Sequence, residues 1–264
     1  MKKKTSILIL MIMSFMFMTM FGQGFYVKAE TEEEIQYTVN PQFSSDGPND
    51  SHEKFANQGL KILANDKGNE AIEIFNKHKN VLLEYCDKPD SDEKQYLFAY
   101  HFYDPYTGKN FLPGFLNASH ITGLTKFQEH MTNAVSSFNN NEDYSIKELG
   151  RAIHFLEDIN VPHHSANLIA VFSTHSMYEK HISENNEKFF ISKGTMYEYC
   201  SQLDFNSFCT EIFNYCAKNS YSYKDIANTL DSKNWDIAAY GTVPKAQEAI
   251  AALLYRFAQE VTNK

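Results

Sequence analysis

The sequence has too little positive charge for one large class of partners. It carries 24 Lys and Arg residues against 33 Asp and Glu residues, which gives a net charge of −9. We therefore expect no nucleic acid bound through a broad basic face and no general attraction to anionic membranes. Any contact with lipid has to be local and mainly apolar.

Long apolar runs are missing beyond the first residues. Positions 1–29 combine three early lysines, an apolar run and a VKA ending, which predicts a secretory signal peptide. No later segment is apolar over enough length to cross a bilayer, so we expect a secreted (extracellular) protein without a transmembrane segment after processing. Residues 30–42 are acidic and lack helical periodicity. They predict a removable pro-segment, with a disordered arm as the alternative.

Cysteine is scarce and lacks the spacing of a metal site. Cys86, Cys200, Cys209 and Cys216 form no CxxC pair, so we do not expect them to bind metal. In an oxidising compartment the last three could form one disulfide and leave one thiol over, but the pairing is not readable from sequence. Internal repeats, low-complexity tracts and segments with strand periodicity are also lacking.

The periodicity that is present is helical. Apolar residues make up 43% of the chain and aromatic residues 14%, which indicates a globular protein with room for one large domain in 264 residues. Residues 87–92 read as a polar loop, and 96–102 as a short helix. A first helix is predicted to begin near Ser51. Further helices are predicted at 71–85, 124–138, 144–159, 175–190 and 203–217, and a last one begins at Pro244. We expect an all-α fold, one compact multi-helix domain with its site between facing helices.

The most informative stretch is HFLEDINVPHHSANLIAVFSTHSMYE. Its His154 and Asp158 are four residues apart, as are His175 and Glu179, so on a helix each pair shares one face. His164 follows a helix-breaking proline between the pairs. Imidazole and carboxylate ligands suit zinc. One pair alone would more often be a contact on a solvated helix face, but two pairs and a further histidine favour a metal site.

Three residues outside this stretch complete a wider pattern. His52 opens the first helix, Asp87 ends another, and His101 stands in YHFYDP. With HFLEDINVPHHSAN they resemble the bacterial zinc-dependent phospholipase C family, which includes the catalytic domain of clostridial alpha-toxin. The resemblance covers residues 43–264, which we expect to form the phospholipase C domain.

Three residues depart from the family signature H-Y-x-(G/T)-D-x-x-x-P-x-H-(P/A)-x-N. They are Phe155 in place of Tyr, Glu157 in place of Gly or Thr, and Ser165 in place of Pro or Ala. None of them stands at a ligand position of the family. This sequence therefore has a matching residue at each side-chain ligand position of the family.

The resemblance implies three zinc ions in one cleft, with Asp158 bridging two of them. In the family the third zinc is completed by the backbone of an N-terminal Trp, whereas the only tryptophan here is Trp235. The backbone of Phe43, the nearest aromatic residue, is the candidate if the mature chain begins there. The implied ligands are His101, His154, Asp158 and a nearby Asp87 for the first zinc, His164, His175 and Glu179 for the second, and His52 and Asp158 for the third.

The resemblance also implies a reaction and a substrate. Asp87, fourteen residues before His101, would be the general base for a metal-activated water that hydrolyses phospholipids at a membrane surface to diacylglycerol and a phosphorylated head group. Choline-selective members have two aromatic residues at the head-group pocket. Phe98 matches one, whereas Lys88 replaces the other and would repel a quaternary ammonium. A broader or different head-group range is therefore expected.

Two other functions stay open from the sequence. One is a secreted zinc-dependent single-strand nuclease, which shares a similar histidine and aspartate core. The other is a non-catalytic helical metal-binding protein. We expect a monomer. The remaining histidines carry no motif and are expected to have ordinary surface or core roles: His78, His120, His130, His163 and His181.

Overall fold

The computed structural model describes residues 51–199 and 201–262. The predicted signal peptide (1–29), the predicted pro-segment (30–42), Phe43 and Cys200 lie outside the described residues. They stay predictions. Cys209 and Cys216 are buried thiols without a disulfide, and burial raises the pKa of each to about 12.

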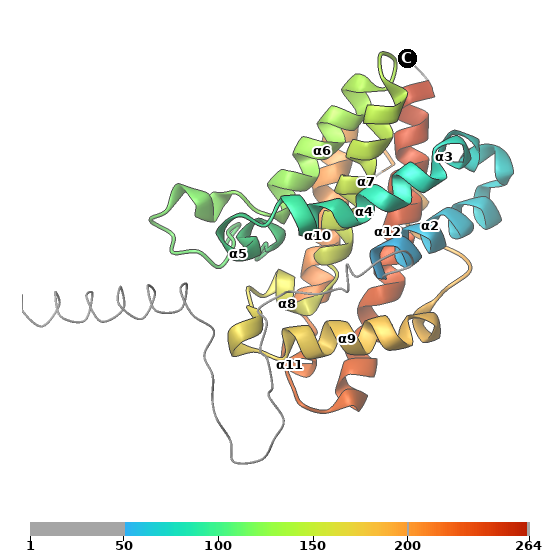
Figure 1. The fold of residues 1–264 in the computed structure, drawn as a ribbon. Helices are drawn as coiled ribbons and strands as arrows, with labels where there is room; N and C mark the ends of the chain where they lie inside the picture. The colour runs from blue at the N-terminus through green and yellow to red at the C-terminus, as the bar shows by residue number, and fades with distance from the viewer. Residues whose placement is uncertain (1–50, 200, 263–264) are drawn as a thin grey trace, which may run out of the picture. The chain divides into compact units, whose positions relative to one another are not determined.

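The described part of the chain is all-α, as predicted (Figure 1). An isolated bridge between Asp104 and Lys109 is the β-type pairing that it contains. None of the described helices is apolar over enough length to cross a membrane. The long helices are α2 (Ser51–Lys67), α4 (Lys79–Asp92), α6 (Gly123–Ser137), α7 (Glu142–Asp158), α9 (His175–Asn185), α10 (Phe205–Tyr221) and α12 (Ser232–Thr262). The short ones are α3 (Glu73–Lys77), α5 (Gln95–Phe98), α8 (Pro162–Ser165) and α11 (Lys224–Ala227).

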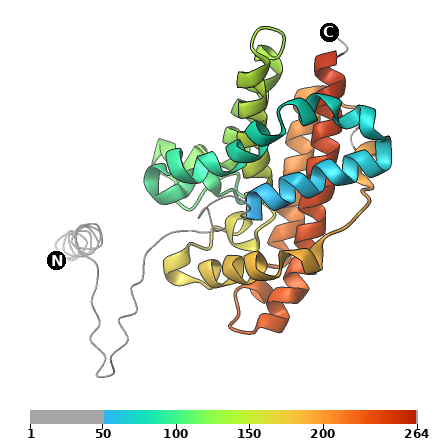
Figure 2. The same ribbon diagram turned by 45° about the vertical axis from the view of Figure 1, so that its right-hand side comes forward.

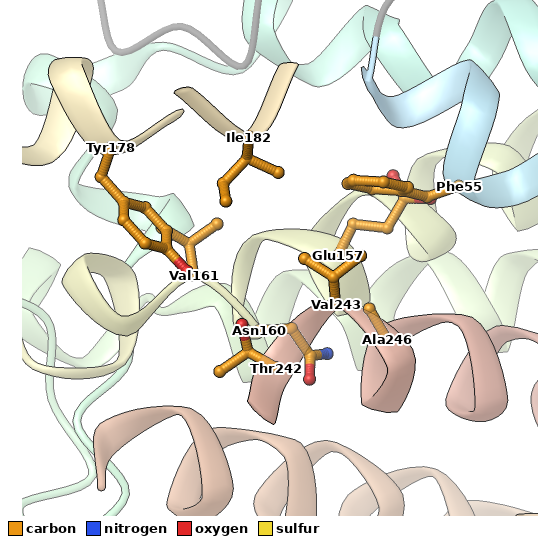
Figure 3. Close-up of a pocket in the computed structure, with 9 residues that line it drawn as sticks. All are labelled: Phe55, Glu157, Asn160, Val161, Tyr178, Ile182, Thr242, Val243 and Ala246. Carbon is orange, nitrogen blue, oxygen red and sulfur yellow. The ribbon is translucent and has the colours of Figure 1, made fainter. Parts of the chain in front are cut away.

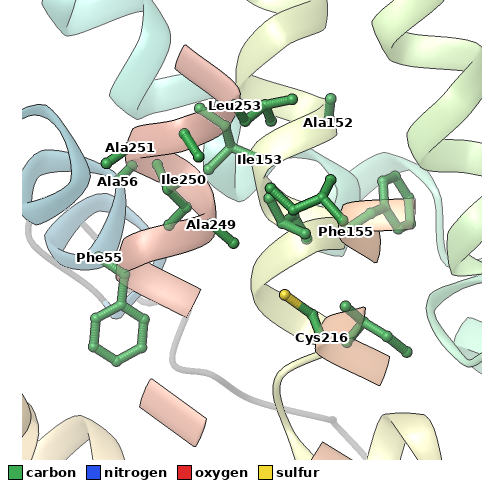
Figure 4. Close-up of a cluster of buried hydrophobic side chains, with 14 of the residues drawn as sticks. Phe55, Ala56, Ala152, Ile153, Phe155, Cys216, Ala249, Ile250, Ala251 and Leu253 are labelled. Atoms are coloured by element: carbon green, nitrogen blue, oxygen red, sulfur yellow. The ribbon is translucent and has the colours of Figure 1, made fainter. Parts of the chain in front are cut away.

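Helix α7 is the central element. It packs against α4 and α6, while α12 packs against α2 and α10 (Figures 1 and 2). Every residue in its last two turns, 152–158, is buried, so this end of the helix is covered on all sides. Figure 4 shows Ile153 and Phe155 of α7 in one apolar cluster with Ile250 and Leu253 of α12. The polar residues on these turns are therefore held in a rigid frame.

A glycine sets the close approach of α4 to α7. A Cβ added at Gly150 would lie 2.6 Å from the carbonyl oxygen of Leu82, so only glycine allows this distance. One turn further along both helices, Nδ1 of His154 donates to the carbonyl oxygen of Cys86 at 2.7 Å. The contact between the two helices thus orients a predicted metal ligand.

Proline explains two of the predicted helix boundaries that are wrong; the predicted helix 71–85 is in addition divided into α3 and α4. Helix α4 continues to Asp92 with Pro89 inside it, and α12 begins at Ser232 and includes Pro244. Proline removes one backbone hydrogen bond from a helix interior. In α12 buried residues such as Val243 and Ala246 flank the proline, so we infer that packing of the adjacent turns offsets the loss.

Residues 96–102 do not form the single short helix that the sequence predicts. Tyr96, Leu97 and Phe98 have φ angles of 51°, 58° and 61°, in the left-handed region. A 3₁₀ turn, Ala99–His101, follows them. This turn places His101, which is 1% exposed, next to Asp158 at the end of α7.

Candidate metal centre

Histidine and carboxylate side chains come together in three groups within the described residues. In each group one nitrogen or oxygen from every member lies within 4.8 Å of the others. Every predicted side-chain ligand except Asp87 belongs to one of them. The groups are His52, His154 and Asp158; Asp90, His101 and His154; and His164, His175 and Glu179.

Asp158, the last residue of α7, lies where the first two groups meet. Its Oδ2 is 2.7 Å from Nδ1 of His101 and 3.2 Å from Nε2 of His154. Its Oδ1 is 3.9 Å from Nε2 of His52, which stands in the first turn of α2. The two oxygens therefore face different histidines, which is the geometry that a carboxylate bridging two metal ions needs.

The third group is built by the turn between α7 and α9. His164 lies on α8, which begins with a proline, and His175 opens α9. Oε1 of Glu179, one turn into α9, is 3.2 Å from Nε2 of His164 and 2.8 Å from Nε2 of His175. The Phe102 ring stacks on His164, with ring centroids 4.6 Å apart. This ring fixes the plane of the imidazole.

Asp90 lies at the position that the family resemblance assigned to Asp87. Oδ1 of Asp90 is 3.6 Å from Nε2 of His154 and 3.7 Å from Nδ1 of His101. The reason is helical phase. Because α4 continues past Pro89, Asp90 stands one turn after Cys86, on the face that contacts His154, whereas Asp87 is rotated by about 100° from Cys86. The expected place of Asp87 in the ligand set is therefore corrected to Asp90.

Lys88 also lies away from the centre. It pairs with Glu84 at 2.9 Å, one turn earlier on α4, and its side chain is 37% exposed. Two residues before Asp90, it points to the opposite side of the helix. The expected repulsion of a quaternary ammonium by Lys88 therefore loses its structural basis. Phe98 is half-buried, with its ring centroid 5.5 Å from that of His101, and stays beside the centre.

Backbone and side-chain acceptors orient four of the histidines. Nδ1 of His52 faces Glu157 Oε2 at 2.6 Å, and Nδ1 of His154 faces the Cys86 carbonyl. Nε2 of His101 lies 3.2 Å from the Glu93 carbonyl, and Nδ1 of His164 lies 3.2 Å from the His101 carbonyl. A carbonyl or carboxylate oxygen accepts, so the facing nitrogen carries the proton and the other nitrogen is free to bind a metal.

The carboxylates give the cluster a strong attraction for positive charge. Burial would lower the pKa of His154, but Asp158 and Asp90 outweigh it and raise that pKa to about 10. Burial, reinforced by the neighbouring His154, holds the pKa of His52 well below its usual value. Burial also raises the pKa of Asp90 to about 6. Among the ion pairs of the described residues, none joins Asp90 or Asp158 to a Lys or Arg.

These residues fit zinc. Nε2 of His154 lies 3.1 Å from Nδ1 of His101, close to the roughly 3.3 Å that separates two nitrogens bound tetrahedrally to one zinc ion. Nδ1 of His175 and Oε2 of Glu179 are buried without a hydrogen-bond partner. Buried polar atoms in native proteins are rarely left in this state. Imidazole and carboxylate donors are also the ligand types that zinc accepts.

A second, half-buried polar cluster lies beside the centre, and no pattern in the sequence predicted it. Glu93, just after α4, is 2.9 Å from Lys126 Nζ, 2.9 Å from His130 Nε2 and 2.8 Å from Arg151 Nη1. His130 also pairs with Glu148 at 2.9 Å. These partners come from α6 and α7, far apart in the sequence. His130 was expected to be an ordinary histidine, and no local motif marks it.

His163 has a role close to the expected one. It is fully buried, its ring stacks parallel to that of His175 at 5.0 Å, and it belongs to none of the three groups. Burial, with the nearby His175, holds the pKa of His163 well below its usual value, so the ring is neutral. It supports the ligand His175 as a packing partner.

Comparison with known proteins agrees with this geometry. The family sequence model described as "Zinc dependent phospholipase C" matches residues 51–223, the span that contains all three groups. The chain belongs to the zinc-dependent phospholipase C family. The family resemblance drawn from the sequence is thereby confirmed.

Several curated relatives are phospholipases C. The chain is 30% identical over 249 residues to a phospholipase C of Paraclostridium bifermentans, covering 84% of this chain and 62% of the relative. It is 28% identical over 238 residues to a phospholipase C of Clostridium perfringens (strain 13 / Type A), covering 81% and 59%. The chain thus spans less than two thirds of the length of these relatives.

Solved structures share the fold. An alpha-toxin from Clostridium absonum superposes with a TM-score of 0.74 at 25% identity, over 84% of this chain and 67% of the toxin. The alpha-toxin of an avian strain of Clostridium perfringens gives a TM-score of 0.71 at 23% identity, over 86% and 65%. The all-α architecture is therefore that of known alpha-toxins.

Proposed function

We propose that this chain is a secreted phosphodiesterase that hydrolyses phospholipids to diacylglycerol and a phosphorylated head group. The observation that carries the proposal is the convergence of three groups of zinc-type ligands around Asp158, in a member of a zinc-dependent phospholipase C family. Three ions are proposed: one would be held by Asp90, His101, His154 and Asp158, one by His52 and Asp158, and one by His164, His175 and Glu179. Secretion rests on the predicted signal peptide at residues 1–29.

The side chains have separate tasks in this reaction. Zinc held by these groups would neutralise the phosphodiester and lower the pKa of a bound water. Asp158 would hold two adjoining positions together, because its Oδ2 faces His101 and its Oδ1 faces His52, while His154 offers Nε2 to one of them. The orienting contacts from Cys86 and Glu93 keep the ligand nitrogens aimed inward.

Asp90 is the proposed general base, in place of Asp87. Its carboxylate sits among His52, His101 and His154, and its side chain is the most exposed of the three carboxylates in the groups, at 9% against 3% for Asp158. An attacking water can therefore reach it. Burial raises the pKa of Asp90, which makes the carboxylate a better proton acceptor.

Phe98 is proposed to contact the lipid head group. It is the aromatic side chain next to His101 that the family pattern anticipated, and it is half-buried. We expect Phe98→Ala to change the ratio of the hydrolysis rates on phosphatidylcholine and phosphatidylethanolamine.

The test uses the zinc-loaded, purified protein. We expect release of diacylglycerol from phosphatidylcholine vesicles, loss of this activity on exhaustive chelation, and its return when zinc is added. Asp90→Asn, assayed in excess zinc so that the centre stays loaded, should lower the rate by about 10²–10⁴-fold, the usual contribution of general base catalysis. Cleavage of single-stranded DNA with no lipid hydrolysis would overturn the proposal. The nuclease and non-catalytic alternatives are not favoured by the family match.

A further inference from the structure

We propose that Glu157 is a positioning residue of the metal centre, which orients His52 and adds a fourth carboxylate beside the ions. Its Oε2 lies 2.6 Å from Nδ1 of His52, and both side chains are 1% exposed. A carboxylate accepts, so Nδ1 of His52 carries the proton and Nε2 is presented to Asp158. The inference depends on the metal centre and is independent of the substrate.

Glu157 reaches His52 because of its place on α7. It precedes Asp158 by one residue, so its side chain leaves the helix about 100° away from the ligand face. Figure 3 shows it extending past Phe55 toward the start of α2, along a small cavity whose lining includes Val161 and Ile182. From this side it contacts Nδ1 of His52, the ring nitrogen that faces away from the metal position.

Glu157 departs from the family signature, which has Gly or Thr at this position. Asp90, Asp158 and Glu179 already bring three carboxylates to the centre. A further buried carboxylate behind a ligand histidine makes that histidine a stronger donor and increases the attraction for a cation. The effect should be largest for the ion bound by His52.

The experiment compares Glu157→Gln with Glu148→Gln. Glu148 is a matched control, because it stands on the same helix, is buried at 7%, and contacts Nδ1 of a histidine at 2.9 Å, but that histidine (His130) is no metal ligand. Zinc content per chain is measured during dialysis against increasing chelator concentrations. We expect Glu157→Gln to lose one zinc with about 10–100-fold weaker affinity, and Glu148→Gln to keep all of its zinc.

A second readout follows the His52 ring itself. Long-range ¹H–¹⁵N NMR should show Nδ1–H in the parent protein and a mixed or reversed tautomer in Glu157→Thr, which has a family residue at this position. Unchanged zinc affinity together with an unchanged tautomer would refute the proposal, and so would equal zinc loss in both Gln variants. Neither readout uses catalysis, so a failure of the proposed lipid hydrolysis would be seen separately.

A second, independent observation concerns exposed apolar side chains on two segments near the predicted metal ligands, residues 105–128 and 159–178. Phe115 is 86% exposed and Phe172 is 77% exposed. We propose that an apolar rim inserts into a zwitterionic phospholipid surface, which deepens the proposed function and rests on it. The rim consists of Phe115, Leu116, Ile121, Val171, Phe172 and Met177, each at least 38% exposed.

The two segments are joined and lie on one side of the fold. Asn167 Nδ2 donates to the carbonyl oxygen of Lys109 at 3.2 Å. In both ribbon views the green segment before α6 and the yellow turn before α9 lie on the same side (Figures 1 and 2). Asn110, 3% exposed, donates to the carbonyl oxygens of Ala118 and Ile121 at 2.8 Å and closes the base of the first segment.

Charge favours lipid as the occupant. The chain has a net charge of −9, yet residues 105–128 and 159–178 contain no Asp or Glu. Insertion into a bilayer interface is costly for carboxylates, and apolar and aromatic side chains supply the binding energy. Because the first segment follows His101 and the second connects His164 with His175, a membrane that touches the rim lies next to the metal centre.

The test separates lipid binding from chemistry. For the double variant Phe115→Ser/Phe172→Ser we expect binding to phosphatidylcholine vesicles to weaken about 100-fold, roughly tenfold for each buried ring. Hydrolysis of a short-chain phosphatidylcholine below its critical micelle concentration should stay within about twofold of the parent. Tyr144→Ser is the control. Tyr144 is 42% exposed at the opposite end of α7 from Asp158, so its removal should not change vesicle binding.

The outcomes are distinct. Unchanged vesicle binding by the double variant would overturn the rim proposal. So would a shift from dimer to monomer in sedimentation, because the rim would then be an interface between two copies. If the parent protein binds vesicles but hydrolyses neither substrate, the proposed function fails while the rim proposal stands.

Discussion

Two clusters of ionisable side chains, one buried and one half-buried, lie next to each other along α7, and they differ in how their charge is balanced. Around Glu93, the negative charge is met by Lys126, Arg151 and His130 at 2.8–2.9 Å. Around Asp158, the described residues offer only histidines as partners. The first cluster is complete within the protein. The second has no Lys or Arg partner among the described residues, which is consistent with the proposed binding of metal ions.

The contrast separates a structural ion-pair network from a binding site. Buried carboxylates are stable when they are paired and hydrogen-bonded. The Glu93 cluster meets this condition, whereas at the metal centre mutual contacts of histidine and carboxylate leave Nδ1 of His175 and Oε2 of Glu179 without partners. The two clusters also touch, because the Glu93 carbonyl faces Nε2 of His101. The complete cluster therefore helps to hold a ligand of the incomplete one.

The largest effect is expected at the junction of the metal groups. Asp158→Asn removes the charge that faces His52, His101 and His154 together. We expect at least about a 10³-fold loss of hydrolysis, which corresponds to about 4 kcal/mol in the activation barrier, and loss of more than one zinc per chain by metal analysis. Retention of all zinc by this variant would contradict the bridging role.

The next effect is on stability. Glu93→Ala removes the carboxylate that three cationic groups share, although each of these groups keeps a second acidic partner. We expect a cost of about 1.5–3 kcal/mol, the usual contribution of a hydrogen bond to a charged group. Thermal unfolding followed by circular dichroism should show a Tm lower by roughly 3–12 °C for a chain of this size. Glu142→Ala is the control. Its pair with Lys77 is exposed and is expected to contribute about 1 kcal/mol or less.

The same cluster sets a smaller dependence of stability on pH. Burial opposes ionisation of Glu93, but His130 and Lys126 outweigh it and hold the pKa of Glu93 below its usual 4.5. Its contribution is therefore complete above that pH and is lost as the pH falls. Burial likewise opposes protonation of His130, but Glu148 and Glu93 outweigh it and raise the pKa of His130 above 6.5. That contribution is complete below pH 6.5 and is lost as the pH rises through the raised pKa.

The difference in unfolding free energy between the parent and Glu93→Gln checks this prediction. Measured in urea across the pH range, the difference should be largest between pH 4.5 and 6.5, the usual values of the two groups. Taking a difference removes most of the acid sensitivity of the metal centre itself. A difference that is flat with pH would mean that the charges at Glu93 and His130 do not stabilise the fold.

The sequence predicted the metal centre better than it predicted the cluster beside it. His154 with Asp158, and His175 with Glu179, follow from helical spacing alone. The all-α fold followed from periodicity. The Glu93 cluster joins residues 33 to 58 positions apart along the chain, since it needs α4, α6 and α7 to be packed. No local pattern carries that information.

The error at Asp87 has a different cause. The choice between Asp87 and Asp90 depends on whether α4 continues through Pro89, because the two side chains leave the helix in different directions. Proline predicts a helix end, and the tertiary contact of α4 with α7 overrides it. Position relative to Cys86, whose carbonyl meets His154, then decides which aspartate faces the centre.

The smallest effect is expected for Asp87→Asn, and it tests which of the two aspartates faces the centre. Asp87→Asn changes a carboxylate that belongs to none of the three groups, so we expect hydrolysis to stay within about twofold of the parent, a change of less than about 0.5 kcal/mol in the barrier. Asp90→Asn, three residues away on the same helix, should be slower by orders of magnitude. Both variants make the same chemical change, a carboxylate to an amide, so a difference between their rates reports the position of the carboxylate. Equal losses would show that the Asp90 carboxylate has no special place in the reaction.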